Sequence, residues 1–206
     1  MILIQENPMV NPIISQSLKS SISYPEYRSL VEQLVKDNST TGLEKTEDLV
    51  NYTKLNDKRM RRWDKTVKVS EEIAFKIKQF DKSVTWLVLT ESWCGDAAHI
   101  LPVINKVAEL NDKIDFKVVL RDENEALMNQ FLTHGGKSIP KLIMIDHSTN
   151  SVVHTFGPRP AAATQLVNDF KTEYGSLTPE FKETLQLWYN KDKGQSTIED
   201  LVHLLN

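Results

Sequence analysis

The chain is poor in cysteine, since Cys94 is the only one among its 206 residues. An intrachain disulfide is therefore excluded, and low cysteine use is typical of a reducing compartment. The start of the chain lacks the basic stretch and small-residue cleavage site of a signal peptide. No apolar run is long enough to span a membrane, because the longest, Trp86 to Leu89, is followed by Thr90 and Glu91. These absences predict a cytoplasmic protein that does not contact a membrane.

The chain also lacks a large excess of charge of either sign, because 25 Lys and Arg residues are balanced by 28 Asp and Glu residues, which gives a net charge of −3. This balance gives no reason to expect a nucleic-acid partner. One basic row is nevertheless present at helical spacing, and it could be a nucleic-acid surface or the solvated side of a helix. The acidity of the whole chain favours the solvated side. The row consists of Lys54, Lys58, Arg61 and Lys65.

Residues 1–69 read as an N-terminal helical extension. Ser23-Tyr24-Pro25-Glu26 is a helix start with Pro inside the first turn and an acid behind it. A longer helix is predicted from Thr46 to Lys65. Its apolar side is expected to carry Leu49, Tyr52 and Leu55.

The middle of the chain, residues 70–175, alternates between strand and helix patterns. Ser70 is a predicted N-cap, followed by apolar residues at helical spacing. The third and fourth strands are close enough in sequence to form a hairpin. The order predicts an α/β protein with a central mixed sheet of about four strands flanked by helices. The expected strands are 84–90, 114–120, 141–146 and 151–156, and the expected helices are 94–110, 123–132 and 160–174.

The tail, residues 176–206, predicts two further helices. Thr178-Pro179-Glu180 begins one of them, and Ser196 to Glu199 resembles a capping box at the start of the second. Both helices have an apolar face that must be covered. The simplest cover is the N-terminal helices or the outer face of the core, and a dimer interface is the alternative.

A motif lies where the first predicted strand meets the next helix: Glu91-Ser92-Trp93-Cys94-Gly95-Asp96. Together with Pro102 and Ser138-Ile139-Pro140, it resembles the thioredoxin superfamily, and more narrowly bacterial thioredoxin-family proteins with a Trp-Cys-Gly-Asp motif. The resemblance implies a thioredoxin-like fold over residues 70–175 with extra helices at both ends. It also implies that Ile139–Pro140 is a cis peptide bond beside the thiol. The site residues it implies are Cys94 as the catalytic thiol and Trp93, Gly95, Asp96, Ile139 and Pro140 as the substrate groove.

The position of Cys94 has a physical reason of its own. At the start of a helix, unpaired backbone N–H groups and the helix dipole favour an anion, here the reactive thiolate. Trp93 is expected to cover one side of the thiol, and Gly95 to let another backbone approach. The alternative is a buried, inert cysteine that acts as a small apolar side chain. The flanking motif and the distant Pro140 favour a site derived from thiol chemistry.

Three departures from the thioredoxin pattern bear on reactivity. Ala97 stands where a dithiol protein has its second cysteine, so Cys94 needs an external thiol to release a mixed disulfide. Asp96 replaces the common proline, and its carboxylate opposes a neighbouring thiolate. Val88 replaces the buried acid of the family six residues before the cysteine, and Glu91, the nearest acid, is expected to point elsewhere.

The remaining histidines, glycines and cations give little indication of a further site. His99 is about 140° around the helix from Cys94 and is expected to be structural or at the surface. Gly135-Gly136-Lys137-Ser138 lacks the first glycine of a phosphate-binding loop, so it is not expected to bind phosphate in that way. Lys137 and Arg159 are expected only to place positive charge near the active face. One cysteine and no paired histidine motif predict no metal site and no cofactor.

Two functions of different classes are therefore open. The first is a monothiol thioredoxin-like protein in which Cys94 exchanges with protein disulfides or low-molecular-weight thiols. The second is a redox-inactive binding module that uses the old substrate groove to hold a protein partner. Cluster binding with an external thiol is a weaker third option, because the Cys-Gly-Phe-Ser motif of monothiol glutaredoxins is absent. The expected oligomeric state is a monomer or a weak homodimer.

Overall fold

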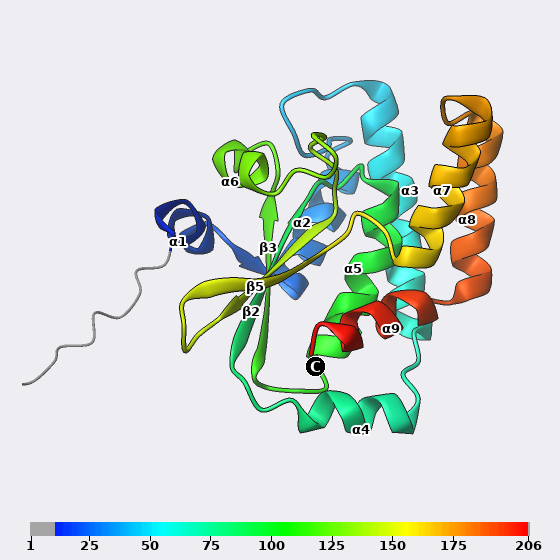
Figure 1. The fold of residues 1–206 in the computed structure, drawn as a ribbon. Coiled ribbons are helices and arrows are strands. Elements are labelled where there is room, and N and C mark those ends of the chain that lie inside the picture. The colour runs from blue at the N-terminus through cyan, green and yellow to red at the C-terminus, as the bar shows by residue number, and fades with distance from the viewer. Residues whose placement is uncertain (1–10, 206) are drawn as a thin grey trace, which may run out of the picture.

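The computed structural model describes residues 11–205 (Figure 1). Residues 1–10, for which no signal peptide is predicted, and residue 206 lie outside the described residues. The described chain alternates helices and strands through its middle and is helical at both ends. In chain order the elements are α1 (Pro12–Lys19), β1 (Ile22–Ser23), α2 (Tyr24–Lys36), α3 (Glu47–Thr66), α4 (Glu71–Gln79), β2 (Val84–Thr90), α5 (Gly95–Ala108), β3 (Ile114–Leu120), α6 (Glu125–Gln130), β4 (Lys141–Asp146), β5 (Ser151–Phe156), α7 (Ala161–Tyr174), α8 (Pro179–Asp192) and α9 (Gln195–His203).

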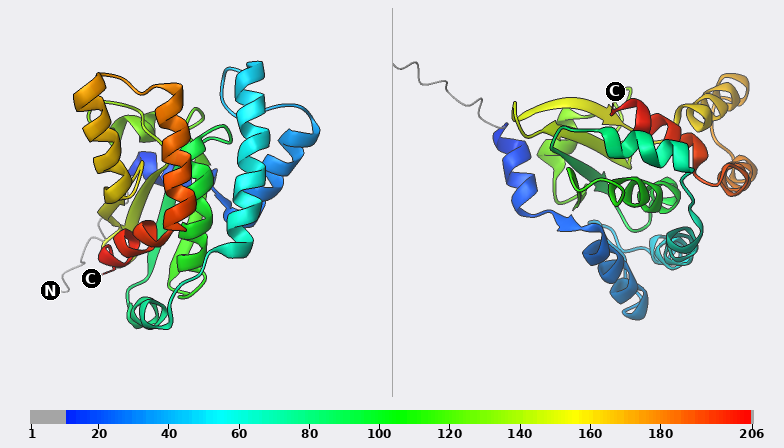
Figure 2. Two further views of the ribbon diagram at one scale, coloured as in Figure 1. Left: turned by 90° about the vertical axis from the view of Figure 1, so that its right-hand side faces the viewer. Right: turned by 90° about the horizontal axis from the view of Figure 1, so that it is seen from below.

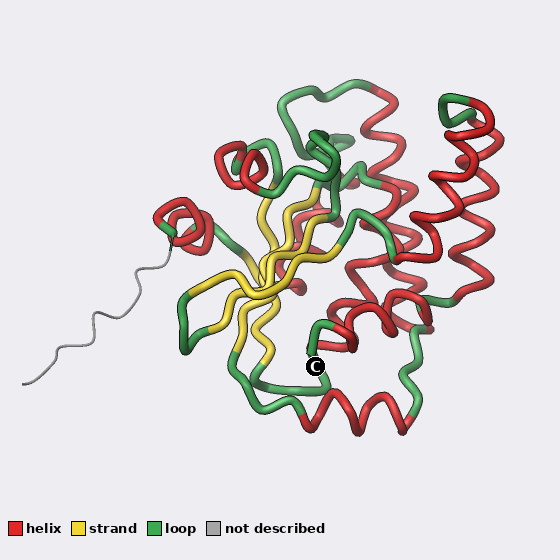
Figure 3. The backbone as a smooth tube through the Cα atoms, in the orientation of Figure 1, coloured by secondary structure: helices red, strands yellow, loops and turns green. Residues whose placement is uncertain are grey.

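The strands form one mixed sheet in the order β1-β3-β2-β4-β5 (Figure 3). β2 runs parallel to β3, whereas β1–β3, β2–β4 and the predicted hairpin β4–β5 are antiparallel. The predicted α/β class and the four predicted strands are confirmed. β1 is a fifth strand that was missed, because a two-residue strand is too short to show any alternation of apolar residues.

Every residue of β2 is buried, so this strand is the centre of the sheet. Both faces of the sheet are covered by helices (Figures 1 and 2). α1 and α6 lie on one side, and α3, α5, α7, α8 and α9 lie on the other. A strand buried on both faces is expected to be a near-continuous run of apolar or β-branched residues, as Val84–Thr90 is.

Four of the predicted helix starts are confirmed by side chains that accept a hydrogen bond from the backbone of the first turn. These N-caps are Ser23, which forms a full capping box with Glu26, and Thr46, Ser70 and Thr178.

The predicted capping box at Ser196 is wrong. The last helix begins at Gln195 with Gly194 as its N-cap, at φ +81°. Ser196 therefore lies inside the first turn, and its hydroxyl donates to the Asp192 carboxylate at the end of α8, at 2.5 Å. The connection between α8 and α9 is shorter than predicted, because Lys193 and Gly194 both adopt left-handed conformations that turn the chain at once.

The buried side of α3 differs from the predicted one. Tyr52 and Leu55 are 48% and 41% exposed. The buried stripe is instead partly polar, because Thr53 and Asn56 bind Ser92, in the segment before Cys94, and Asp57 pairs with Arg28 and Arg61. Its members are Val50, Thr53, Asn56, Asp57, Met60 and Trp63. The basic row predicted as the solvated side carries no buried residue.

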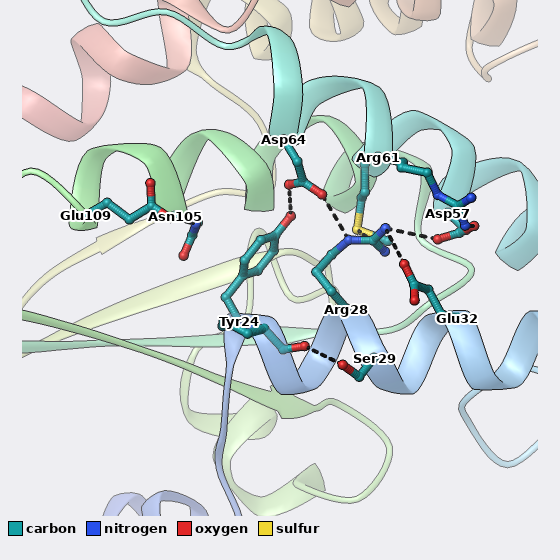
Figure 4. A network of polar contacts seen from close by, with 11 residues as sticks. Tyr24, Arg28, Ser29, Glu32, Asp57, Arg61, Asp64, Asn105 and Glu109 are labelled. Carbon is teal, nitrogen blue, oxygen red and sulfur yellow. Dashed lines mark hydrogen bonds and ion pairs between the residues drawn. The ribbon is translucent and has the colours of Figure 1, made fainter.

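The N-terminal helices are fastened to each other by a network around Arg28 (Figure 4). This side chain is buried on α2 and donates to Asp57 at 3.0 Å and to Asp64 at 3.1 Å, both on α3. The Tyr24 hydroxyl also donates to Asp64, at 2.6 Å. A buried guanidinium requires such partners, since an unpaired buried charge costs several kcal/mol. α3 in turn packs along α5, the helix that follows the motif.

The tail helices pack on their own chain, as the simpler alternative predicted. α9 packs on α4, α5 and α7. The apolar faces of both tail helices are buried, through Phe181, Leu185 and Tyr189 on α8 and Ile198 and Leu201 on α9. Within residues 11–205 there is no helix with the length and apolar character needed to cross a membrane.

Candidate functional site

The single thiol lies at the junction of β2 and α5. Cys94 is the N-cap residue of α5 and is 7% exposed. Its Sγ donates a hydrogen bond to the carbonyl oxygen of Ile139, at 3.3 Å. The peptide bond between Ile139 and Pro140 is cis. The structure therefore brings together three residues expected at the site, although 45 positions of sequence separate Cys94 from Ile139.

The sheet explains this meeting. Leu89 near the end of β2 pairs with Lys141 at the start of antiparallel β4, so the residues flanking them share one edge of the sheet. Gly157 packs closely against this loop: a Cβ at this position would lie only 2.2 Å from the carbonyl oxygen of Pro140. Its φ of +108° also disfavours any other residue. The glycine after the last strand thus allows the chain to lie directly on Pro140.

Hydroxyl groups from the N-terminal extension hold the segment before the thiol. The Ser92 side chain lies within hydrogen-bond distance of the Thr40, Thr41 and Thr53 hydroxyls, at 3.1, 3.1 and 2.9 Å. The Asn56 amide donates to the carbonyl oxygen of Ser92 at 2.9 Å. All of these residues are buried. Because buried polar groups require such partners, the cluster fixes the backbone that enters Cys94.

Burial raises the pKa of the Cys94 thiol to about 12, and the nearby Asp96 carboxylate adds to this effect. The backbone N–H groups of Ala97 and Asp96 and the charge of Arg159 act in the opposite direction. The helix start therefore favours the thiolate as predicted, but burial outweighs it. At pH 7 roughly one molecule in 10⁵ carries the thiolate.

Both oxygens of Asp96 have partners. Arg159 lies 2.6 Å from one of them, and the Tyr189 hydroxyl of α8 donates to the other at 2.9 Å. Burial raises the pKa of Asp96, while Arg159 and the two hydrogen bonds lower it. The expected opposition between Asp96 and a thiolate at Cys94 is present, and Arg159 partly offsets it.

Trp93 lies at a pocket whose lining does not include Cys94 or Ile139. The pocket has a volume of about 510 Å³ and is also lined by Arg121 and Lys137. The Arg121 guanidinium lies over the indole, 5.0 Å from the ring centroid, a cation–π arrangement. The cations of this pocket already have partners, since Arg121 pairs with Asp122 at 2.7 Å and Lys137 pairs with Glu125.

Gly95 lies beside a side chain of the N-terminal extension. No backbone of another described segment lies within 4 Å of the position where its Cβ would be. The nearest atom to an added Cβ is instead a guanidinium nitrogen of Arg59 on α3, at 3.7 Å. Arg59 was not singled out in the sequence, because only the folded packing of α3 on α5 brings it beside the motif.

The position six residues before the cysteine, where the family has a buried acid, is occupied here by the fully buried, apolar Val88. Glu91 is nonetheless a buried acid, and burial raises its pKa. The backbone N–H of Asp122 donates to its Oε1 at 2.9 Å, while its Oε2 has no hydrogen-bond partner among the described residues. The sequence did not indicate this burial, because a charged residue next to a strand end is usually exposed.

His99 is structural, one of the two roles predicted for it. It is 3% exposed, and Trp63 donates to its Nδ1 at 2.9 Å. Since an indole N–H can only donate, Nδ1 is unprotonated, and Nε2 donates to Gln186 at 2.6 Å. The ring also stacks on Tyr189, with centroids 4.4 Å apart. Burial lowers the pKa of His99 to about 4, so the ring is neutral at pH 7.

Residues 11–205 contain no group of three or more His, Cys, Asp or Glu side chains placed to hold a metal ion. The residues that sequence reasoning missed come from both extensions. Tyr189 reaches Asp96 from α8, and Arg59, Thr53 and Asn56 reach the motif from α3. Their only signal in the sequence is polar or aromatic character within a helix, which does not indicate the target.

A central mixed sheet, with a thiol at a strand-to-helix junction and a cis-proline loop beside it, defines a thioredoxin-like α/β protein. A family model described as thioredoxin matches residues 42–171, and the chain belongs to this family. The matched region begins before α3, so it includes part of the N-terminal extension. A search of curated protein sequences finds no match.

Two solved structures are similar in fold. The protein of unknown function PA1234 from Pseudomonas aeruginosa has a TM-score of 0.58 and 16% identity, over 89% of this chain and 97% of that one. An HIV epitope scaffold has a TM-score of 0.55 and 17% identity, over 89% of this chain and 98% of that one. Both cover most of the present chain, so the fold that they share with it extends beyond the thioredoxin core into the added helices.

Proposed function

We propose that the protein is a monothiol thioredoxin-like protein in which Cys94 exchanges with protein disulfides or low-molecular-weight thiols. The observation that carries the proposal is the placement of the thiol, whose Sγ lies 3.3 Å from the Ile139 carbonyl at the N-terminus of α5. The backbone N–H groups of Asp96 and Ala97 favour negative charge on this sulfur. The sole thiol of the chain thus lies beside the cis-proline loop that, in the resemblance, binds an extended substrate.

The exchange has two balanced steps. The Cys94 thiolate attacks one sulfur of a disulfide, so that a mixed disulfide forms and the other half leaves as a thiolate. Because Ala97 carries no sulfur, an external thiolate then attacks the mixed disulfide and releases Cys94 as a thiolate. The protein is neither oxidised nor reduced over the cycle.

The rate of the first step depends on the fraction of thiolate. With the pKa of Cys94 raised to about 12, this fraction increases about tenfold with each pH unit between pH 7 and 10. The direct test is to incubate wild type and Cys94→Ser with an aromatic disulfide over this range and follow the mass of the protein.

An adduct on wild type only, formed faster at higher pH and removed by an added thiol, supports the proposal. The absence of any adduct at every pH, while circular dichroism shows that the protein stays folded, overturns it. The same measurement on Ala97→Cys asks whether a second sulfur in this scaffold removes the adduct without an added thiol.

A second candidate, a redox-inactive module that binds a protein partner, is favoured by the burial of Cys94 and by the uncharged Val88 at the position where the family has a buried acid. It predicts that Cys94→Ser binds the partner as tightly as wild type. Affinity capture with both proteins in parallel separates the candidates. A partner recovered equally by both supports the binding module, and a partner recovered only through a disulfide to Cys94 supports exchange.

A further inference from the structure

A pocket with one sign of charge lies between α3 and α8, over the first turns of α5, in the region where Figure 2 shows these helices side by side. We call it the basic pocket. Its volume is about 270 Å³, and His99 and Gln186 are among its lining residues. Three of its lining side chains are cationic, and no acid lines it. The cations are Lys58, Arg59 and Arg62.

These three cations have no ion-pair partner within 4.0 Å among residues 11–205. Arg59 donates to the Asn56 amide oxygen at 3.0 Å, and Arg62 donates to the Asn190 amide oxygen at 2.6 Å. Both acceptors are neutral. The larger pocket beside Trp93 is different, since both of its cations are paired with acids.

The surrounding groups supply only part of the missing negative charge. Burial and the charge of Arg62 lower the pKa of Arg59, while Tyr52 and Asp96 raise it. His99 and Gln186 are neutral. The acid nearest to Arg59 along α5, Asp96, is already paired with Arg159. Arg59 is half-buried, while Lys58 and Arg62 are exposed. Like charges gathered around one pocket repel one another, and an anion that enters the pocket relieves this repulsion.

We propose that the basic pocket binds the oxyanion group, phosphate or carboxylate, of a small molecule. Two guanidinium groups can grip such a group through paired N–H donors, and Lys58 adds a third charge. The volume is below the roughly 300 Å³ at which pockets for drug-sized ligands begin, so one charged group fits better than a whole large ligand.

The pocket is connected to the thiol site through Arg59. This guanidinium reaches to 3.7 Å from the Cβ position of Gly95, the residue after Cys94. A molecule held by its oxyanion in the basic pocket can therefore extend toward the start of α5. Resting on the proposed exchange reaction, this assigns the low-molecular-weight partner of Cys94 to the anionic thiols and disulfides.

The binding test uses inorganic phosphate and pyrophosphate titrated into the full chain by calorimetry. We expect saturable binding to wild type that weakens about tenfold or more in Arg59→Gln, Arg62→Gln and Lys58→Gln. Lys65→Gln is the matched control, because it removes the same charge from an exposed position of α3 outside the pocket. Lys58 is exposed, so its variant is the one expected to fold without change.

Two results overturn the proposal: no binding of either anion at millimolar concentration, or an equal loss of affinity in Lys65→Gln. The latter would mean that net charge alone attracts the anion.

The link to the thiol is tested separately with two disulfides. Dithiobis(nitrobenzoate) carries carboxylates and dithiodipyridine does not, and each releases a coloured thiolate or thione when Cys94 forms the mixed disulfide. We expect Arg59→Gln to slow the carboxylate disulfide about tenfold more than it slows the neutral one. An equal change in the two rates, or no change in the rate of the carboxylate disulfide, overturns the link. If neither disulfide reacts, the proposed exchange fails while anion binding in the first test stands.

Discussion

Replacing Asp96 by Asn should make Cys94 more reactive. The Asp96 carboxylate is the second cause, after burial, of the raised pKa of the thiol. Asparagine keeps the size of the side chain and can still accept the Tyr189 hydrogen bond, but it carries no charge. The change also removes the ion-pair partner of Arg159, so that the positive charge of Arg159 is no longer offset by Asp96 and stabilises the thiolate more strongly. Both effects lower the pKa of Cys94.

The size of the effect follows from the charge removed. A close charge shifts a pKa by about one to three units, and each unit changes the thiolate fraction tenfold at a pH below the pKa. Starting from about 12, a shift of about one unit raises the thiolate at pH 8 from roughly 1 in 10⁴ to roughly 1 in 10³. The side chains of Asp96 and Arg159 are 12% and 21% exposed, so the broken pair costs stability, roughly 1 to 2 kcal/mol.

The assay is the rate of alkylation by iodoacetamide at pH 8, followed by mass, with a thermal melt to show that the variant is folded. Asp112→Asn is the matched control, because it removes the same charge from an exposed position. Arg159→Gln should slow alkylation. An unchanged or lower rate in Asp96→Asn would refute the assignment of Asp96 as the group that suppresses the thiolate.

Three further outcomes are expected. The pKa of His99 is about 4 in the folded protein, below its ordinary value of 6.5, so as the pH falls the unfolded chain binds a proton first. Between pH 6.5 and 4, the free energy of unfolding of wild type should therefore fall by up to about 3 kcal/mol relative to that of His99→Gln. Parallel pH curves for the two proteins in urea unfolding would contradict this. Gly157→Ala should destabilise the fold by roughly 3 kcal/mol or more, because its Cβ would overlap the Pro140 carbonyl oxygen, and an unchanged melting temperature would be the contrary result. Ala97→Cys should form a disulfide with Cys94 on oxidation, detected as the loss of both alkylatable thiols; two thiols that remain free would show that the scaffold no longer places them in reach.

Most of the fold could be predicted from short-range patterns in the sequence. The apolar run of β2 and the hydroxyl N-caps of four helices were readable because each depends on neighbours in sequence. The thiol site was partly readable, since Cys94 and Pro140 belong to one motif pattern.

What could not be read depends on contacts distant in sequence. The inner face of α3 was assigned from its apolar residues, but Thr53 and Asn56 are buried because Ser92 offers them partners 39 and 36 residues away. The same holds for Arg59 beside Gly95 and for Tyr189 on Asp96. In each case the side chain is polar, and its destination is set by tertiary packing and not by helical period.

The buried hydroxyl cluster around Ser92 has a consequence for how far the motif can be transplanted. Its partners Thr40, Thr41 and Thr53 come from outside the predicted core of residues 70–175. Grafting Trp93 to Ala97 onto an ordinary thioredoxin would leave the backbone before the cysteine without these anchors. Cutting this chain at residue 69 would likewise strip the anchors from a motif that remained intact. The motif and the N-terminal extension therefore have to be transferred together, and chimeras should exchange residues 40–66 along with the motif.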